Sequence, residues 1–225
     1  MKKNLKKSGG LLLLAVIFIA LTSCSKSKDT PAGNTDNISN STSGLLFLQS
    51  QVSSLPYEAL SGDERNSLIY MREEEKLARD VYITLNTKWN TNVFSNISSS
   101  EQVHMDAILM LLKKYDIDDP VGTNGVGIFT NQTLQGLYTQ LVAEGNATLL
   151  AAYKTGAAIE DLDLFDLTKD MAKIDNQDIK MVYDNLARGS RNHLRAFYRN
   201  ILNAGGTYAP QYITQAEFDN IISNN

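Results

Sequence analysis

The sequence has little cysteine, which forms disulfides and thiolate metal clusters, and little proline, which interrupts helices. Its 225 residues include a single cysteine, Cys24, which excludes an internal disulfide and a metal cluster held by several thiolates. The four prolines lie outside the long segments with helical periodicity; they are Pro31, Pro56, Pro120 and Pro210. Because proline breaks the interior of an α-helix, this distribution favours an all-α fold.

An excess of basic charge is also missing. The formal net charge is −4, and four lysines fall within the first seven residues, a segment that we expect to be removed. The remaining chain would carry 17 basic and 25 acidic residues, a net charge of −8. Since binding to phosphate backbones depends on clustered Lys and Arg, nucleic acid is not an expected partner.

The N-terminal residues have the pattern of an export signal. A basic start precedes an apolar run from Leu11 to Leu21, which is short for a membrane span and typical of a signal-peptide core. The following Leu21-Thr-Ser-Cys24 resembles the lipobox of bacterial lipoproteins, which implies cleavage before Cys24 and lipidation of that residue. The alternative is an ordinary secretory signal or an N-terminal anchor helix with a chance cysteine. The resemblance implies a lipid-anchored cell-envelope protein, periplasmic or surface-facing, that meets the membrane through Cys24.

Composition divides the chain into three parts. Residues 1–23 are the expected lipoprotein signal peptide, and residues 24–44 are rich in Ser, Asn, Thr and Gly, as expected of a flexible tether. Residues 45–225 are expected to form one helical domain. Within it, apolar residues at a spacing of three to four predict long helices over about 63–88, 98–115, 147–172 and 177–204. Shorter helices are expected over about 131–143 and after Thr214, and the irregular, glycine-containing segment 116–130 would join the second long helix to the third.

Polar residues interrupt the apolar stripes of these helices at matching places. Glu101 and His104 are one helical turn apart, and a carboxylate and an imidazole at this spacing can bind one metal ion. Glu75, Glu160 and His193, the second of the only two histidines, fall on the inward faces of the other three long helices. A buried carboxylate without a partner is costly, so this set of oxygen and imidazole ligands predicts a metal site inside the bundle.

Three stretches of the chain resemble the ferritin-like superfamily, and most closely an uncharacterised ferritin-like domain family of bacteria and archaea. They are residues 70–82 (YMREEEKLARDVY), 100–106 (SEQVHMD) and 189–197 (GSRNHLRAF). The resemblance extends over residues 55–222. It implies a four-helix bundle with a long crossover between its second and third helices, short additional helices, and a carboxylate–histidine site for one or two ions, with iron expected and manganese or zinc as alternatives.

The resemblance also implies a role for each matching residue. Glu75 and Glu160 would be carboxylate ligands, Glu101 would bridge two ions, and His104 and His193 would be the imidazole ligands. Asp163 resembles an extra carboxylate of rubrerythrin-like sites, and Tyr82 matches a tyrosine that lies beside the metals in ferritins. Ser190 departs from the pattern, since it stands where a second Glu-x-x-His motif would have its glutamate. This departure leaves open whether one or two ions bind.

Each candidate ligand also has a structural interpretation. Glu101 could close a capping box with Ser98, and His193 could be a hydrogen-bonded core histidine. The run Glu73-Glu74-Glu75 could be a solvated face, with Glu74 as the alternative ligand to Glu75. Asp161 and Asp166 are expected on the surface. Gly189-Ser190-Arg191 lies within a predicted helix, which argues against a hydrolase nucleophile at Ser190.

The sequence therefore predicts a ferritin-like metal-binding protein of the cell envelope. If it is an enzyme, its chemistry would be redox, either oxidation of ferrous iron or reduction of dioxygen or peroxide. The chain lacks a Cys-x-x-Cys segment that would relay electrons, so no electron donor is indicated. A homodimer is an expected assembly. The rival hypothesis is a non-enzymatic envelope scaffold or partner-binding bundle whose polar core is closed by hydrogen bonds.

Overall fold

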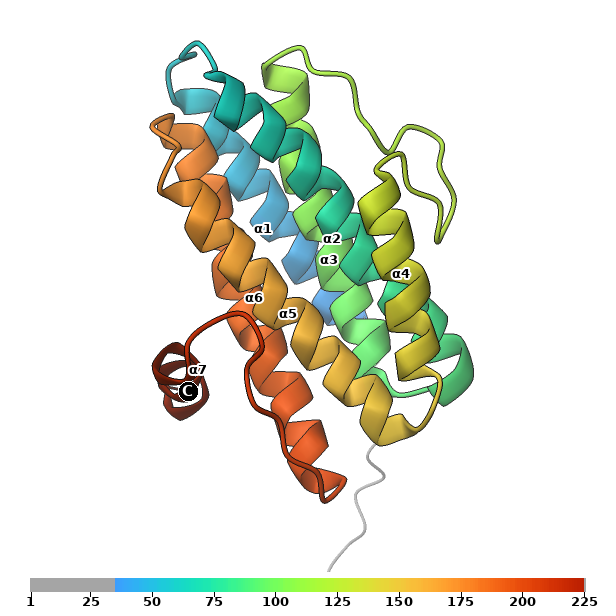
Figure 1. Ribbon diagram of the computed structural model, residues 1–225. Helices are drawn as coiled ribbons and strands as arrows, with labels where there is room; N and C mark the ends of the chain where they lie inside the picture. The colour runs from blue at the N-terminus through green and yellow to red at the C-terminus, as the bar shows by residue number, and fades with distance from the viewer. Residues whose placement is uncertain (1–34, 225) are drawn as a thin grey trace, which may run out of the picture. The chain divides into compact units, whose positions relative to one another are not determined.

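The described part of the chain, residues 35–224 of a computed structural model, contains seven α-helices and no β-strand (Figure 1). The helices are α1 (Thr35–Ser54), α2 (Gly62–Trp89), α3 (Asn92–Lys114), α4 (Gln132–Gly145), α5 (Leu149–Met171), α6 (Gln177–Asn203) and α7 (Gln215–Ser223). The prediction of an all-α fold is thus confirmed for these residues. The predicted signal peptide and Cys24 lie outside the described residues. Among the helices within 35–224, none combines the length and the apolar character that a membrane span requires.

The long helices pack as two pairs, α2 with α3 and α5 with α6 (Figure 1). The pairs meet through α2 against α5 and α3 against α6, so four helices enclose one core. Helix α4 covers the seam between α2 and α5, and α1 lies along α3 and α6. Buried apolar side chains follow the predicted inward faces, from Leu68 and Met71 on α2 to Val182 and Phe197 on α6.

Local sequence signals account for where the helices begin and end. Ser61 and Glu64 form a capping box at the start of α2, and Thr214 and Glu217 form another at the start of α7, as their spacing predicts. Helix α3 begins at Asn92 rather than near Ser98, because Asn90 in a left-handed conformation ends α2 and leaves only a tight connection. Helix α1 begins at Thr35 rather than at the predicted domain boundary, Leu45.

The irregular segment between α3 and α4 is held by a buried ion pair. The Lys76 ammonium pairs with Asp80, one turn along α2, and also donates to the Gly125 carbonyl oxygen at 2.7 Å. The Gly127 amide donates to Asp80 at 2.9 Å. A side chain at Gly127 would overlap Tyr138, and its φ of 79° favours glycine. These contacts fix the long segment that carries the chain towards α5.

Candidate metal centre

Five buried polar side chains converge in the middle of the bundle, and they come from four helices. Glu75 lies on α2, Glu101 and His104 on α3, Glu160 on α5 and His193 on α6. Each is between 1% and 8% exposed. The inward orientation that the apolar stripes predict for them is therefore what the structure has. The structure brings all five together.

The five side chains form two groups that share Glu101. His104 Nδ1 lies 2.8 Å from Glu101 Oε2 and 3.1 Å from Glu75 Oε2. His193 Nδ1 lies 2.8 Å from Glu101 Oε1 and 3.4 Å from Glu160 Oε2. The two carboxylate oxygens of Glu101 thus face different histidines. Each Glu/Glu/His triad has its candidate ligand atoms within 4.8 Å of one another, so each could hold a metal ion.

Hydrogen bonds account for only part of this arrangement: His104 Nδ1 is hydrogen-bonded to Glu75 Oε2 at 3.1 Å, but other atoms of the cluster have no partner. Glu101 Oε1 and His193 Nδ1 are 2.8 Å apart, yet neither atom is hydrogen-bonded, and Glu75 Oε1 is also buried without a partner. Leaving a buried polar atom unsatisfied costs about 1–3 kcal/mol, so most such atoms in proteins have a partner. A cation coordinated by these oxygen and imidazole nitrogen atoms would satisfy them, and the donor set suits a hard or borderline divalent metal. The residues present therefore fit a metal ion.

The electrostatics of the cluster favour cation binding. Burial raises the pKa of Glu75 to about 7, and burial together with the charge of Glu101 raises the pKa of Glu160 to about 7. Burial alone would raise the pKa of Glu101, but the two histidines hold it well below its ordinary range. Burial alone would lower the histidine pKa values, but the carboxylates raise that of His193 to about 10 and that of His104 well above its usual value. Without a metal ion, protons on the histidines therefore compensate the buried carboxylates.

Two residues that sequence reasoning missed position the histidines. Ser100 Oγ lies 2.9 Å from His193 Nε2, on the side of the ring opposite the carboxylates. Gly189 on α6 faces His104, and a Cβ atom there would lie 2.4 Å from His104 Nε2. Ser100 directly precedes Glu101, and Gly189 is one turn before His193, but only the packing of α3 against α6 shows what they contact.

The predicted neighbours of the centre lie beside it in different ways. The Tyr82 hydroxyl donates to Glu160 Oε1 at 2.5 Å, which orients that carboxylate. Ser190 donates to Asp163 Oδ2, and the other oxygen of Asp163 has no partner. Asp163 is not a member of either triad. It instead lines a small cavity next to the triads, together with Glu74.

Two structural interpretations of the acidic residues are wrong. Glu101 cannot be a capping-box residue with Ser98, because α3 begins at Asn92 and Ser98 lies inside the helix. Glu73, Glu74 and Glu75 are 2%, 4% and 2% exposed, so the run is not a solvated face.

The expected surface position of Asp161 is also wrong, since this residue is fully buried. Its carboxylate accepts hydrogen bonds from the Tyr208 hydroxyl and from the backbone amides of residues 211–213, which fold back over α5. Asp166 is partly buried, with 14% of its side chain exposed. The periodicity of α5 places Asp161 off the apolar stripe, and the contacts that cover it come from a distant part of the chain.

A larger cavity reaches the centre from the side of α1. It has a volume of about 850 Å³ and is lined by residues of α1, α3 and α6, including Leu48, Val103, Met181 and His104. One edge of His104 therefore lies at this cavity, although the ring is only 8% exposed. A small molecule in the cavity would contact the edge of the triad formed by Glu75, Glu101 and His104.

Comparisons with known proteins place most of the chain in one family. The family described as an uncharacterised protein domain, DUF2202, matches residues 64–225. The uncharacterised protein MJ0754 of Methanocaldococcus jannaschii is 53% identical over 173 residues, which is 77% of this chain and 94% of that protein. The crystal structure of the hypothetical protein MJ0754 superimposes with a TM-score of 0.75, covering 76% of this chain and 98% of that one.

Proposed function

This chain belongs to the DUF2202 family, and we propose that it is a ferritin-like protein whose buried carboxylate–histidine centre binds iron. The observation that carries the proposal is the pair of triads that share Glu101, in which Glu101 Oε1, His193 Nδ1 and Glu75 Oε1 are buried without a hydrogen-bond partner. The arrangement of two helix pairs joined by a long crossover is consistent with a ferritin-like bundle.

The chain's own residues would divide the work of holding the ions. Glu75 and His104 would bind at one position, Glu160 and His193 at the other, and Glu101 would bridge the two because its oxygens face both histidines. An Nε2–H donated from His193 to Ser100 would leave Nδ1 free to bind the metal, as is usual for a ligating histidine. Two triads favour two ions, and with Ser190 in place of a glutamate, Glu101 is the one carboxylate that the two positions share.

A redox role follows from the choice of iron. Iron bound here would supply one-electron chemistry, passing electrons from the ferrous state to dioxygen or peroxide. Tyr82 would hold Glu160 in place by its hydrogen bond, and the cavity at the edge of His104 would give a small oxidant a way in. Manganese or zinc would fit the same ligands, and zinc would make the centre structural rather than redox-active.

We also propose that the protein is anchored to the cell envelope. The lipobox-like Leu21-Thr-Ser-Cys24 supports lipidation at Cys24, and two or more acyl chains would hold the domain stably at a membrane surface. The residues between Cys24 and α1 would separate the bundle from that surface. The bundle would act there alone or as a homodimer, with the electron donor supplied by another molecule.

Metal analysis of the full-length chain tests the proposed centre. After anaerobic reconstitution with ferrous iron, we expect between one and two bound ions per chain, and a loss of bound iron in both His104→Ala and His193→Ala. Asp184→Asn, a change of an exposed acid on α6, is the control and should bind as the unaltered chain does. Binding of less than roughly half an equivalent of iron, manganese or zinc would overturn the proposal.

Oxygen and peroxide consumption by the iron-loaded chain then tests the redox role. Consumption that disappears in both histidine variants supports it. If iron binds but neither oxidant is consumed, the centre serves storage or structure.

A further inference from the structure

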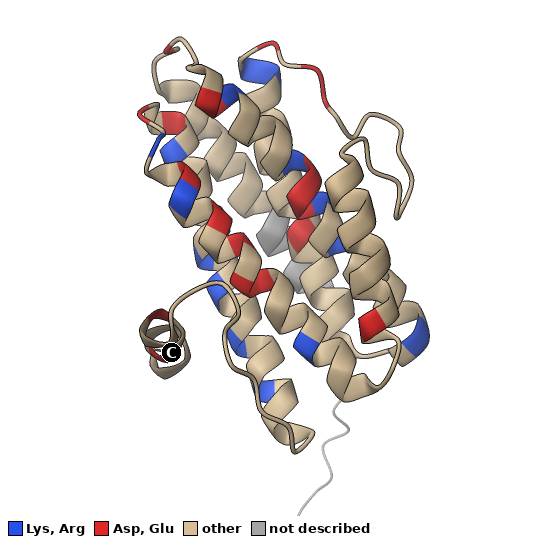
Figure 2. Cartoon of the chain, viewed as in Figure 1, with Lys and Arg blue, Asp and Glu red and all other residues tan. Residues whose placement is uncertain are grey.

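A row of carboxylates leads from the metal centre to the surface along α5. Glu160, Asp163, Asp166 and Asp170 recur at intervals of three and four residues, which places them on one face of the helix. Their burial decreases along the row, from Glu160 at 1% and Asp163 at 6% to the partly buried Asp166 and Asp170. At a rise of about 1.5 Å per residue the row is roughly 15 Å long. Figure 2 shows acidic residues following one another along α5.

Helix α2 faces this row with Glu74, a carboxylate that is buried without a hydrogen-bond partner in the described part of the chain. Glu74 is 4% exposed, and both of its oxygens are buried without a hydrogen-bond partner. The charges that act on it come from Asp163 and Asp166 on α5 and from the adjacent Glu75. No basic side chain pairs with Glu74 in the described residues. A structural carboxylate at this depth would be expected to have a donor.

The space around Glu74 is the size of one ion. A cavity of about 10 Å³ is lined by five carboxylates and four apolar residues: Glu74, Asp163, Glu75, Glu101 and Glu160, with Leu77, Ala78, Ile159 and Leu162. This volume corresponds to about one water-sized sphere. Glu74 and Asp163 therefore border the same small space as the triads, although neither belongs to a triad.

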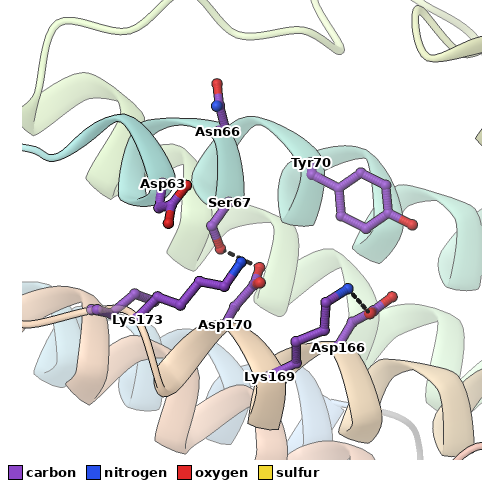
Figure 3. Close-up of a pocket in the computed structure, with 9 residues that line it drawn as sticks. Asp63, Asn66, Ser67, Tyr70, Asp166, Lys169, Asp170 and Lys173 are labelled. Carbon is purple, nitrogen blue, oxygen red and sulfur yellow. Dashed lines mark hydrogen bonds and ion pairs between the residues drawn. The ribbon is translucent and has the colours of Figure 1, made fainter.

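The outer end of the carboxylate row opens into a surface pocket. This pocket has a volume of about 360 Å³ and lies between α2 and the end of α5, where Asp63, Asp166 and Asp170 are opposed by Lys169 and Lys173. Figure 3 shows Ser67, Asp166 and Asp170 projecting into the space between the two helices. The Lys169 ammonium is 3.4 Å from Asp166, and its side chain is 57% exposed, so an approaching cation can replace it at little cost.

From this geometry we propose that Glu74, Asp163 and Asp166 form a second cation site, through which divalent metal ions pass between the pocket of Figure 3 and the centre. The inference rests on the proposed metal centre and adds the route by which it is loaded. Glu74 is the transfer point, since its carboxyl group interacts with both the partly exposed Asp166 and the buried Glu75. A ligand set made only of carboxylates binds a borderline ion such as Fe²⁺ or Co²⁺ more weakly than the triads with imidazole do, which suits transit rather than storage.

The kinetics of cobalt loading test this route in the full-length chain. Co²⁺ is the probe, because it is not oxidised during loading and its visible absorption reports ligation by the histidines. Stopped-flow mixing should show a loading rate that falls about tenfold or more in both Glu74→Gln and Asp166→Asn, with the final absorbance unchanged. The matched control is Asp184→Asn, which removes the same charge at the mouth of the cavity under α1. Its rate should stay within about twofold of the unaltered chain.

Each other result overturns a specific statement. Loading rates that are unchanged in both variants refute the route and leave the centre intact. A loss of final absorbance in Glu74→Gln would mean that Glu74 is a ligand of the centre itself, which refutes the route. Slower loading in Asp184→Asn alone would mean that ions enter through the cavity under α1, which also refutes the route. Absence of the cobalt spectrum in the unaltered chain refutes the proposed centre instead. If Glu74→Gln does not fold, Asp166→Asn decides, since Asp166 is closer to the surface.

Discussion

Gly189→Ala would place a methyl group against His104, and we expect it to weaken metal binding far more than it weakens the fold. The new Cβ would lie 2.4 Å from His104 Nε2 and 2.6 Å from Cε1. Ordinary contacts between such atoms are about 3.5 Å, so the imidazole ring must move by about 1 Å. His104 Nδ1 is 2.8 Å from Glu101 Oε2, and ligand distances at a metal are held to within about 0.2 Å. We therefore expect Co²⁺ affinity to fall about 10- to 100-fold.

The same substitution should also lower the stability of the fold, but by a smaller amount. Alanine in place of glycine inside a helix stabilises by about 0.5–1 kcal/mol, whereas overpacking costs about 1–3 kcal/mol. Gly189→Ala should thus lower the free energy of unfolding by about 1 kcal/mol. Gly136→Ala on α4 is the matched control, because a Cβ atom there meets nothing within 4 Å. It should raise that free energy by about 0.5–1 kcal/mol and leave cobalt affinity unchanged.

Cobalt titration and chemical denaturation of both variants, in the full-length chain, separate the two effects. If Gly189→Ala is stabilised as much as Gly136→Ala and binds cobalt as tightly as the unaltered chain, then Gly189 does not position His104 and the reasoning is refuted.

Three further predictions follow from the buried polar groups. The pKa values of Glu75 and Glu160 are raised from 4.5 to about 7, so between these pH values the native metal-free state binds more protons than the unfolded state. Chemical denaturation should therefore show that the free energy of unfolding falls as the pH rises from about 4.5 to 7, by up to about 3 kcal/mol per glutamate. Lys76→Met removes the buried ammonium and leaves Asp80 paired with Arg79 alone, so it should cost about 1–3 kcal/mol in the same assay. Ser100→Ala removes the hydrogen bond to His193 and should weaken cobalt binding about tenfold in titrations, while stability changes by no more than about 1.5 kcal/mol.

Each of these predictions has a result that contradicts it. Stability that rises across the same pH range would mean that the two glutamates are not protonated in the metal-free fold. A Lys76→Met variant as stable as the unaltered chain would show that the irregular segment does not depend on the ion pair. Equal cobalt affinity in Ser100→Ala would remove Ser100 from the positioning of His193.

The helices and the inward ligands could be predicted because both depend on local periodicity. The stripe of α6 predicts burial of Ile179, Val182 and His193, and all three are buried. The capping box at Ser61 marks the start of α2, and Gly205, with a φ of 73°, follows the end of α6. Such signals are contained within one or two turns of a helix.

The remaining parts of the site depend on how distant segments meet, and periodicity carries no signal for that. Asp161 lies off the apolar stripe of α5 and is buried only because residues 208–213 fold over it. The closeness of Gly189 to His104 depends on the distance between α3 and α6. The 3-3-4 spacing of carboxylates on α5 can be read from the sequence, but the sequence does not show that Glu74 of α2 faces them.

The run Glu73-Glu74-Glu75 depends on the number of residues that precede it in α2, because this number sets the direction in which each glutamate points. Glu73 accepts hydrogen bonds from the amides of Thr130 and Asn131 at the start of α4, Glu74 faces α5, and Glu75 faces His104 on α3. Successive residues of an α-helix are rotated by about 100°, so three neighbouring side chains reach three different partners. Inserting or deleting a single residue upstream in the helix would turn each glutamate towards its neighbour's partner. Families that use such a run should therefore tolerate substitutions in this helix more readily than changes in its phase.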